Sequence, residues 1–203
     1  MKIISLKLKT LNIVILFLNR LKYISAEEVK RELKIKEKKK VALMDLPDLR
    51  ILSFPISNKQ IVIETNRFIV YDLFDNKKKN IDRKGLFKYF SEIFKLFADE
   101  KMKAFGFNYE ILVELDRLDY KNLVEKKITN SLKSENILAT GRNITYLKNK
   151  IKYRIDIDSR ERNQLAINFN VHYEVDKPPS VAQLDKNLLT NFSELKRIIT
   201  NLF

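Results

Sequence analysis

The segment from position 105 to 115 reads FGFNYEILVEL, and its residue order decides the fold class. Large apolar side chains stand at every odd position, from Phe105 through Tyr109 to Leu115. Most even positions carry glycine, asparagine or glutamate. Such a period of two is typical of a β-strand that is buried on one face. The segment therefore predicts a central strand that presents its odd-numbered side chains to a core.

Segments on both sides of this strand are rich in branched and aromatic residues, which favour strands. Five more strands are predicted, at Ile3–Leu18, Leu49–Ile56, Ile61–Leu73, Ile144–Ile157 and Leu165–Val175. A helix is the competing interpretation for the part of the first segment from position 11 onward.

Helices are predicted where apolar residues recur three and four positions apart. The clearest segments are Leu86–Phe97 and Leu188–Leu202, and the second of them should bury Phe192 at its centre. A third helix should begin after Ser25, because serine is a favourable N-cap and two glutamates follow it. A short fourth helix is expected around Tyr120–Ile128.

The expected order is strand, helix, two strands and helix, and the same order then repeats. Phe68 and Val70 in the first half match Phe169 and Val171 in the second, at an interval of about one hundred residues. We therefore predict one α+β domain, 1–203, with an antiparallel sheet of about six strands and helices packed on one face. Its halves, 1–101 and 102–203, would be two βαββα pseudo-repeats; chance is the alternative, because few residues are identical.

The composition excludes several classes of protein. The chain of 203 residues has no cysteine, which excludes disulfide scaffolds, zinc ribbons and thiol nucleophiles. His172 is its single histidine, so a multi-histidine metal site is impossible and a Ser-His-Asp triad is not expected. The three glycines are isolated, and no glycine-rich phosphate loop exists. No cofactor and no catalytic residue is predicted.

The longest apolar run, Leu11–Leu18, is far too short to span a membrane as a helix. The N-terminal residues imitate a short signal peptide, but Asn19 and Arg20 follow the apolar run where small residues would be expected. We expect a strand here and a cytoplasmic protein, which the absence of cysteine also fits.

The formal net charge of +14 favours a polyanionic partner, either nucleic acid or an acidic protein. Lys148, Lys150 and Lys152 alternate within a predicted strand, so their ammonium groups would project from one side. Tyr153 would stand beside them and stack on bases. The alternatives are that lysine runs merely solvate loops and that the composition reflects an AT-rich genome.

Two carboxylates have the spacing of metal ligands. Asp156 and Asp158 lie two positions apart on a predicted strand, so they would share a face and could hold Mg²⁺ with Glu174 or Asp176. The preferred interpretation is that they solubilise the neighbouring hairpin, because no fixed third ligand is visible. No metal is therefore predicted.

Three segments resemble a sporadically distributed family of uncharacterised prokaryotic α+β proteins. They are the motif Phe105–Ile111, the strand Ile167–Val175 and the closing helix that ends in Leu202 and Phe203. That family reads Arg-Tyr-Ile-Asn in its central strand where this chain reads Phe-Asn-Tyr-Glu, and it implies no activity or site residue. The layout is also similar to that of SecB-like export chaperones, which pair an antiparallel sheet with long helices.

These observations predict a binding or scaffold protein without catalytic activity, for nucleic acid or a partner protein, within a homo- or hetero-oligomer. The first alternative is a SecB-like peptide-holding chaperone, which would expose an apolar groove. The second is a metal-dependent nuclease, which would lose activity on chelation.

Overall fold

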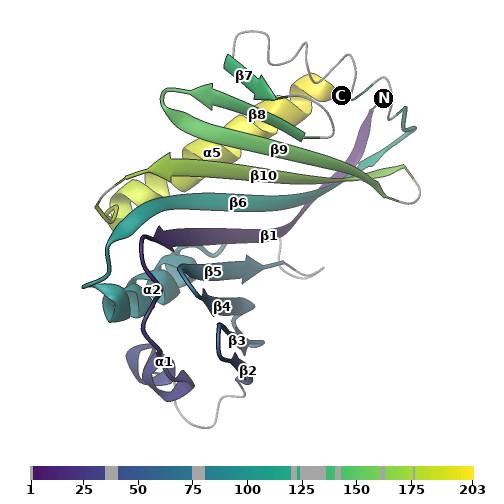
Figure 1. Cartoon of the computed structure of the whole chain (residues 1–203). Helices are drawn as coiled ribbons and strands as arrows, with labels where there is room; N and C mark the ends of the chain where they lie inside the picture. The colour runs from purple at the N-terminus through teal and green to yellow at the C-terminus, as the bar shows by residue number, and fades with distance from the viewer. Residues whose placement is uncertain are drawn as a thin grey trace. The chain divides into compact units, whose positions relative to one another are not determined.

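A computed structural model of the chain describes residues 2–34, 41–74, 81–119, 123, 136–139, 143–160, 163–175 and 177–203. The expected helix around Tyr120–Ile128 lies almost wholly outside the described residues. About half of the described residues lie in strands (Figure 1). They are β1 (Ile3–Phe17), β2 (Ala42–Leu46), β3 (Leu49–Phe54), β4 (Lys59–Glu64), β5 (Arg67–Leu73), β6 (Met102–Leu115), β7 (Asn136–Ala139), β8 (Asn143–Lys148), β9 (Ile151–Arg160) and β10 (Gln164–Glu174).

The described helices are α1 (Ala26–Glu32), α2 (Arg83–Phe94), the short 3₁₀ helix η1 (Lys95–Phe97) and α5 (Val181–Leu202). Ser25 caps α1 as predicted: its hydroxyl accepts the Glu28 N–H at 3.2 Å, and the Glu28 carboxylate accepts the Ser25 N–H at 2.8 Å. Among the described residues no helix is both long enough and apolar enough to cross a membrane.

The fold is α+β, and the strands form one antiparallel sheet in the order β2-β3-β4-β5-β1-β6-β10-β9-β8-β7. The prediction of about six strands was wrong, since the described residues include ten. Two predicted strands are hairpins that turn at Thr65–Asn66 and at Asn149–Lys150. Asn149 and Lys150 have φ angles of 51° and 64°, as both central residues of a tight hairpin turn require. β2 and β7 were not predicted at all.

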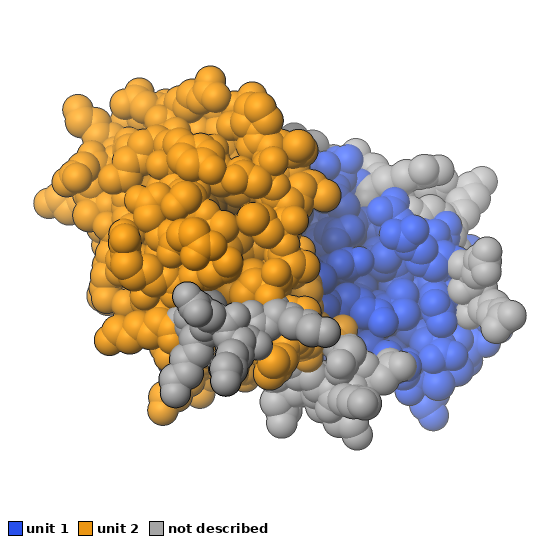
Figure 2. Space-filling model, turned by 90° about the horizontal axis from the view of Figure 1, so that it is seen from below, with its two compact units in different colours: residues 1–10, 107–173, 182–203 blue, residues 11–106, 174–181 orange. Residues whose placement is uncertain are grey.

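The corrected order places four strands, not two, between α1 and α2, and four more between β6 and α5. The chain divides into two compact units (Figure 2). Unit 1 holds residues 1–10, 107–173 and 182–203, and unit 2 holds residues 11–106 and 174–181. The duplication of the two halves stays a prediction.

In unit 2 the core lies between α2 with η1 and one face of the strands. Phe68 of β5 packs against Phe90 and Phe97, with ring centroids 5.8 and 5.3 Å apart. Phe17 of β1 adds a contact to Phe97 at 5.5 Å. The apolar spacing of this helix therefore marks a buried stripe, as the sequence indicates.

In unit 1 the core lies between α5 and one face of β6, β10, β9 and β8. The Tyr109 hydroxyl donates to the Leu188 carbonyl at 2.9 Å, and the Tyr109 ring stacks on Phe192 at 5.9 Å. Phe192 itself is only partly buried, and the Lys196 ammonium lies 4.7 Å from its ring centroid. Phe192 was predicted as a core residue, and it contacts the core through Tyr109 without being buried, because α5 turns its Leu188–Leu195 line more directly toward the sheet.

Candidate binding surfaces

The three predicted lysines do not form one row. Lys148 ends β8 and its ammonium pairs with Glu194 of α5 at 3.1 Å, so it lies on the helix-covered side. Lys150 occupies the turn, and Lys152 is an exposed residue of β9. The expected common face was wrong because the chain reverses at Asn149 and Lys150 instead of continuing as a strand. Nucleic-acid binding by Lys150 and Lys152 stays a prediction.

Tyr153 is 5% exposed and belongs to the core. Its ring stacks on Tyr146 at 5.0 Å with an interplanar angle of 9°, and it lies 5.8 Å from Phe169. Its ring therefore has little surface to offer to a base. Strand alternation explains the arrangement, because Tyr153, Ile155 and Ile157 share the face that α5 covers.

The candidate metal ligands lie on the opposite face of β9. The Asp156 carboxylate is held by its neighbour, since the Arg154 Nε lies 3.0 Å from both of its oxygens. Asp158 is exposed and is the Cα partner of Ala166. Asp176 lies outside the described residues. Within the described part of the chain no three acidic or histidine side chains are placed to share a metal ion.

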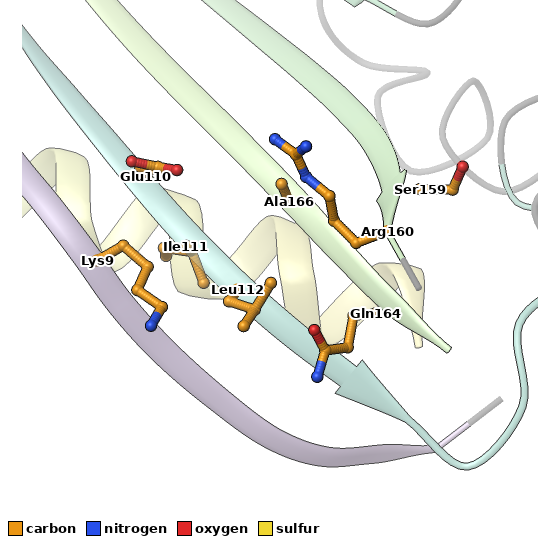
Figure 3. A pocket seen from close by; sticks show the side chains of 8 residues that line it. All are labelled: Lys9, Glu110, Ile111, Leu112, Ser159, Arg160, Gln164 and Ala166. Atoms are coloured by element: carbon orange, nitrogen blue, oxygen red, sulfur yellow. The ribbon is translucent and has the colours of Figure 1, made fainter. Parts of the chain in front are cut away.

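A hollow of about 850 Å³ lies on this open face of unit 1 (Figure 3). It is lined by Lys9, Glu110, Ile111, Leu112, Ser159, Arg160, Gln164 and Ala166. Leu112 and Ala166, on neighbouring strands β6 and β10, provide apolar surface in its middle. The Glu110 carboxylate accepts the Thr10 hydroxyl at 3.4 Å. The hollow thus combines two cations, one carboxylate and one amide around an apolar floor.

A second surface is the outer edge of β2 in unit 2. β2 is the terminal strand of the sheet order, and all five of its residues are exposed. Three of them are large and apolar: Leu43, Met44 and Leu46 are 49%, 51% and 50% exposed. An unpaired edge presents a row of backbone N–H and C=O groups to any strand that approaches it. Natural edges are usually protected by charges, and Asp45 is the single charged residue of β2.

That aspartate is engaged on the inner side of the strand. The Tyr23 hydroxyl donates to Asp45 at 2.9 Å, and the Arg50 Nε lies 3.3 Å from the same carboxylate. The Arg50 guanidinium lies 4.0 Å from the Tyr23 ring centroid, and Arg50 is 7% exposed. The hydrogen bond from the Tyr23 hydroxyl to Asp45 raises the pKa of Tyr23, and desolvation adds a smaller increase. This cluster anchors β2 on its inner side, and no strand among the described residues pairs with its outer edge.

An apolar row continues from β2 into the sheet. Met44 pairs with Ile51, Ile51 with Val62, and Val62 with Ile69, so one side chain from each of four strands stands in line. By strand alternation this row points away from the face where Phe68 meets α2. Exposure falls from 51% at Met44 to 6% at Val62 and Ile69. The accessible apolar surface is therefore concentrated at the β2 end.

Sequence reasoning missed both surfaces. The signal for β2 was present: an apolar run, Val41–Leu46, precedes a Pro47–Asp48 turn and another apolar run, which is typical of a hairpin. The preceding lysines, Lys36–Lys40, were interpreted as a solvated loop or a helix end, and no element was predicted for the run after them. The hollow had no local signal, because its residues come from β1, β6, β9 and β10.

No protein family matches the sequence, and no curated protein is similar to it. Among solved structures, TBP of Methanococcus jannaschii aligns with 94% of this chain and 99% of its own, at 12% identity and a TM-score of 0.31. A likeness this low carries no argument about function.

Proposed function

We propose that this chain is a binding protein for another protein, and that the outer edge of β2 takes an extended segment of that partner. The supporting observation is that β2 is the terminal strand of the sheet in the described part of the chain and carries three exposed apolar side chains. In strand addition, backbone hydrogen bonds provide affinity and alternate side chains provide specificity. Leu43 would contact the added strand on one face, and Met44 and Leu46 would contact it on the other.

The sequence also indicates the charge of the partner segment. Lysines stand at positions 36, 38, 39 and 40, immediately before β2 in the chain. A segment with apolar residues in its centre and acidic residues at one end would match this combination. Charge pairs of this kind increase the association rate and weaken as salt rises. This partner corresponds to the acidic protein expected from the net charge, and a peptide-holding role uses the same edge.

The test is binding of a fluorescent peptide of alternating valine and threonine with three terminal glutamates, followed by anisotropy. Wild type should bind it, and the double variant Met44→Lys and Leu46→Lys should weaken binding at least about tenfold, because charges block strand addition. The matched control is Leu189→Lys, which changes an apolar residue of α5 that is 44% exposed. Equal binding by all three proteins would refute the proposal.

The competing outcome is that a second copy of this chain occupies the outer edge of β2, and the same variants test for it. Light scattering that shows a wild-type dimer and a monomeric double variant would replace the partner protein by self-association. A wild-type monomer that binds the peptide supports the proposal as stated.

A second candidate function is nucleic-acid binding, which the net charge of +14 favours. Exposed Lys150 and Lys152 remain the residues to test. Affinity for a duplex that falls steeply with salt, and a smaller slope in the double Gln variant, would support it.

We also propose that the fold arose by duplication. Each half contains a long strand and, later, four consecutive antiparallel strands followed by an amphipathic helix, β2–β5 with α2 and β7–β10 with α5. Superposition of one half on the other tests this relation: matching strand order and helix position would support it, and different connections would contradict it.

A further inference from the structure

We propose that the hollow in unit 1 binds a nucleoside phosphate whose base carries an amino group. This inference goes beyond the peptide-binding proposal and does not depend on it, because the hollow lies in unit 1 and β2 lies in unit 2. Its volume of about 850 Å³ lies within the range of small-molecule sites.

The order of strands sets the shape of the site. Across unit 1 the strands run β1, β6, β10 and β9, so Lys9 and Arg160 stand on the outer pair. Three strand spacings separate them, or about 14 Å between backbones. Leu112 and Ala166 stand on the two strands between them. A cation on each side of an apolar floor fits an elongated ligand with an apolar body.

The charges argue against a bare anion. Glu110 lines the hollow between the two cations, and exposed Asp158 lies on the same face beside Ala166. A phosphate alone would meet these carboxylates as well as the cations. A ligand that is anionic at one end and donates hydrogen bonds at the other uses both kinds of group.

A nucleotide has this distribution of groups. Its phosphate would pair with the Arg160 guanidinium, which matches phosphate oxygens with two parallel hydrogen bonds. Its base would cover Leu112 and Ala166, and its amino group would donate to the Glu110 carboxylate. Figure 3 shows the Arg160 guanidinium next to Ala166 of β10 and the Glu110 carboxylate over the neighbouring strand β6. The aromatic side chains Tyr109, Tyr153 and Phe169 lie in the core, so the floor that contacts the base is aliphatic.

The experiment is calorimetric titration of the full chain with cytidine 5′-phosphate, uridine 5′-phosphate and inorganic phosphate. We expect saturable binding of the cytidine nucleotide and about tenfold weaker binding of the uridine nucleotide, which lacks the amino group. Arg160→Gln should weaken both at least about tenfold. Glu110→Gln should remove the preference between the two. Lys186→Gln, at an exposed position of α5 outside the hollow, should change neither.

Two sources of the nucleotide are distinguished by adding a cytidine trinucleotide. Tighter binding of the trinucleotide, weakened by Lys9→Gln, assigns the site to a nucleotide within a strand, with Lys9 on the next phosphate. Equal affinity assigns it to a free nucleotide. Inorganic phosphate that binds as tightly as either nucleotide, or nucleotide binding that survives Arg160→Gln in a variant with unchanged melting temperature, would overturn the proposal.

Discussion

The two helix–sheet interfaces bury polar groups with different chemistry. In unit 2 the Lys59 ammonium is fully buried and contacts Asp72 at 2.6 Å and Asp82 at 3.0 Å, which joins β4, β5 and the N-cap of α2. In unit 1 the buried side chains of the corresponding layer make neutral hydrogen bonds: Tyr109 donates to the Leu188 carbonyl, and Asn191 accepts from Tyr173 at 3.0 Å. The Lys148–Glu194 ion pair of this layer is partly exposed. The ionic interface should depend on pH and fail severely when one partner is lost, whereas the neutral one should respond mildly.

The packing of the two helices offers the largest expected difference. Phe90 of α2 is 3% exposed and contacts Phe68 and Phe94, whereas Phe192 of α5 is only partly buried. Phe90→Ala should lower the free energy of unfolding by about 4 kcal/mol, and Phe192→Ala by about 2 kcal/mol, because less surface is lost from the core. Denaturant unfolding measures both. Equal losses would mean that the two stripes are buried to the same extent.

The ionic cluster gives the next largest effect. Asp72→Asn removes a partner of the buried Lys59 and should cost about 3 kcal/mol, the lower end for a broken buried pair, since Asp82 remains. Lys59→Met combined with Asp72→Leu should recover most of this loss, because no buried charge is left unpaired. Thermal melts of the three proteins decide the matter. A double variant as unstable as the single one would show that shape, not charge, limits this site.

The same cluster predicts a loss of stability in alkali. Burial opposes the charged form of Lys59, but its hydrogen bonds and charge interactions with Asp72 and Asp82 prevail and raise its pKa. A raised folded pKa means that the stabilisation is complete below the unfolded pKa, about 10.4, and is lost as pH rises through the folded value. Melting temperatures across this range should fall less in the Lys59→Met and Asp72→Leu double variant than in wild type.

The neutral interface should show a smaller effect. Tyr173→Phe leaves the buried Asn191 carbonyl oxygen without this donor and should cost about 1–2 kcal/mol. The loss should be independent of pH between 5 and 9, roughly the range in which no unperturbed tyrosine or carboxyl titrates. Urea unfolding at three pH values checks this. A strong pH dependence would contradict the neutral description of the interface.

The smallest expected effect concerns the partly exposed ion pairs of α5. The hydrogen bond from Arg197 is the main cause that lowers the pKa of Glu194. Desolvation opposes this shift, and a hydrogen bond from Lys148 adds to it. This contribution is therefore present above the unfolded pKa, about 4.3, and is lost as pH falls through the lower folded value. Glu194→Gln should remove a few tenths of a kcal/mol at neutral pH and flatten the acid side of the stability curve. If stability fell with acid in the Glu194→Gln variant as it does in wild type, the ion pairs of Glu194 would contribute nothing to the pH dependence.

The sequence predicted the elements whose side-chain periodicity is strong. The alternation in β6, the stripes of α2 and α5 and the Ser25 cap are local patterns, and the structure confirms them. Asn149 and Lys150 were misinterpreted because a two-residue turn interrupts a stretch of mixed apolar and charged residues too briefly to change its average strand propensity. β2 was missed because its apolar run is short and directly follows a lysine-rich segment, which indicated a loop or a helix end.

The candidate surfaces show what local sequence patterns could not predict. Lys148, Lys150 and Lys152 share a sequence pattern, but a hairpin sends them to different surroundings. Lys9, Glu110, Gln164 and Arg160 share no pattern, yet strand pairing brings them around one hollow. Local sequence determines backbone conformation and the buried face of each element, because both depend on neighbours within a few residues. Only the tertiary structure decided which exposed side chains meet, because strand order and register join residues far apart in the chain.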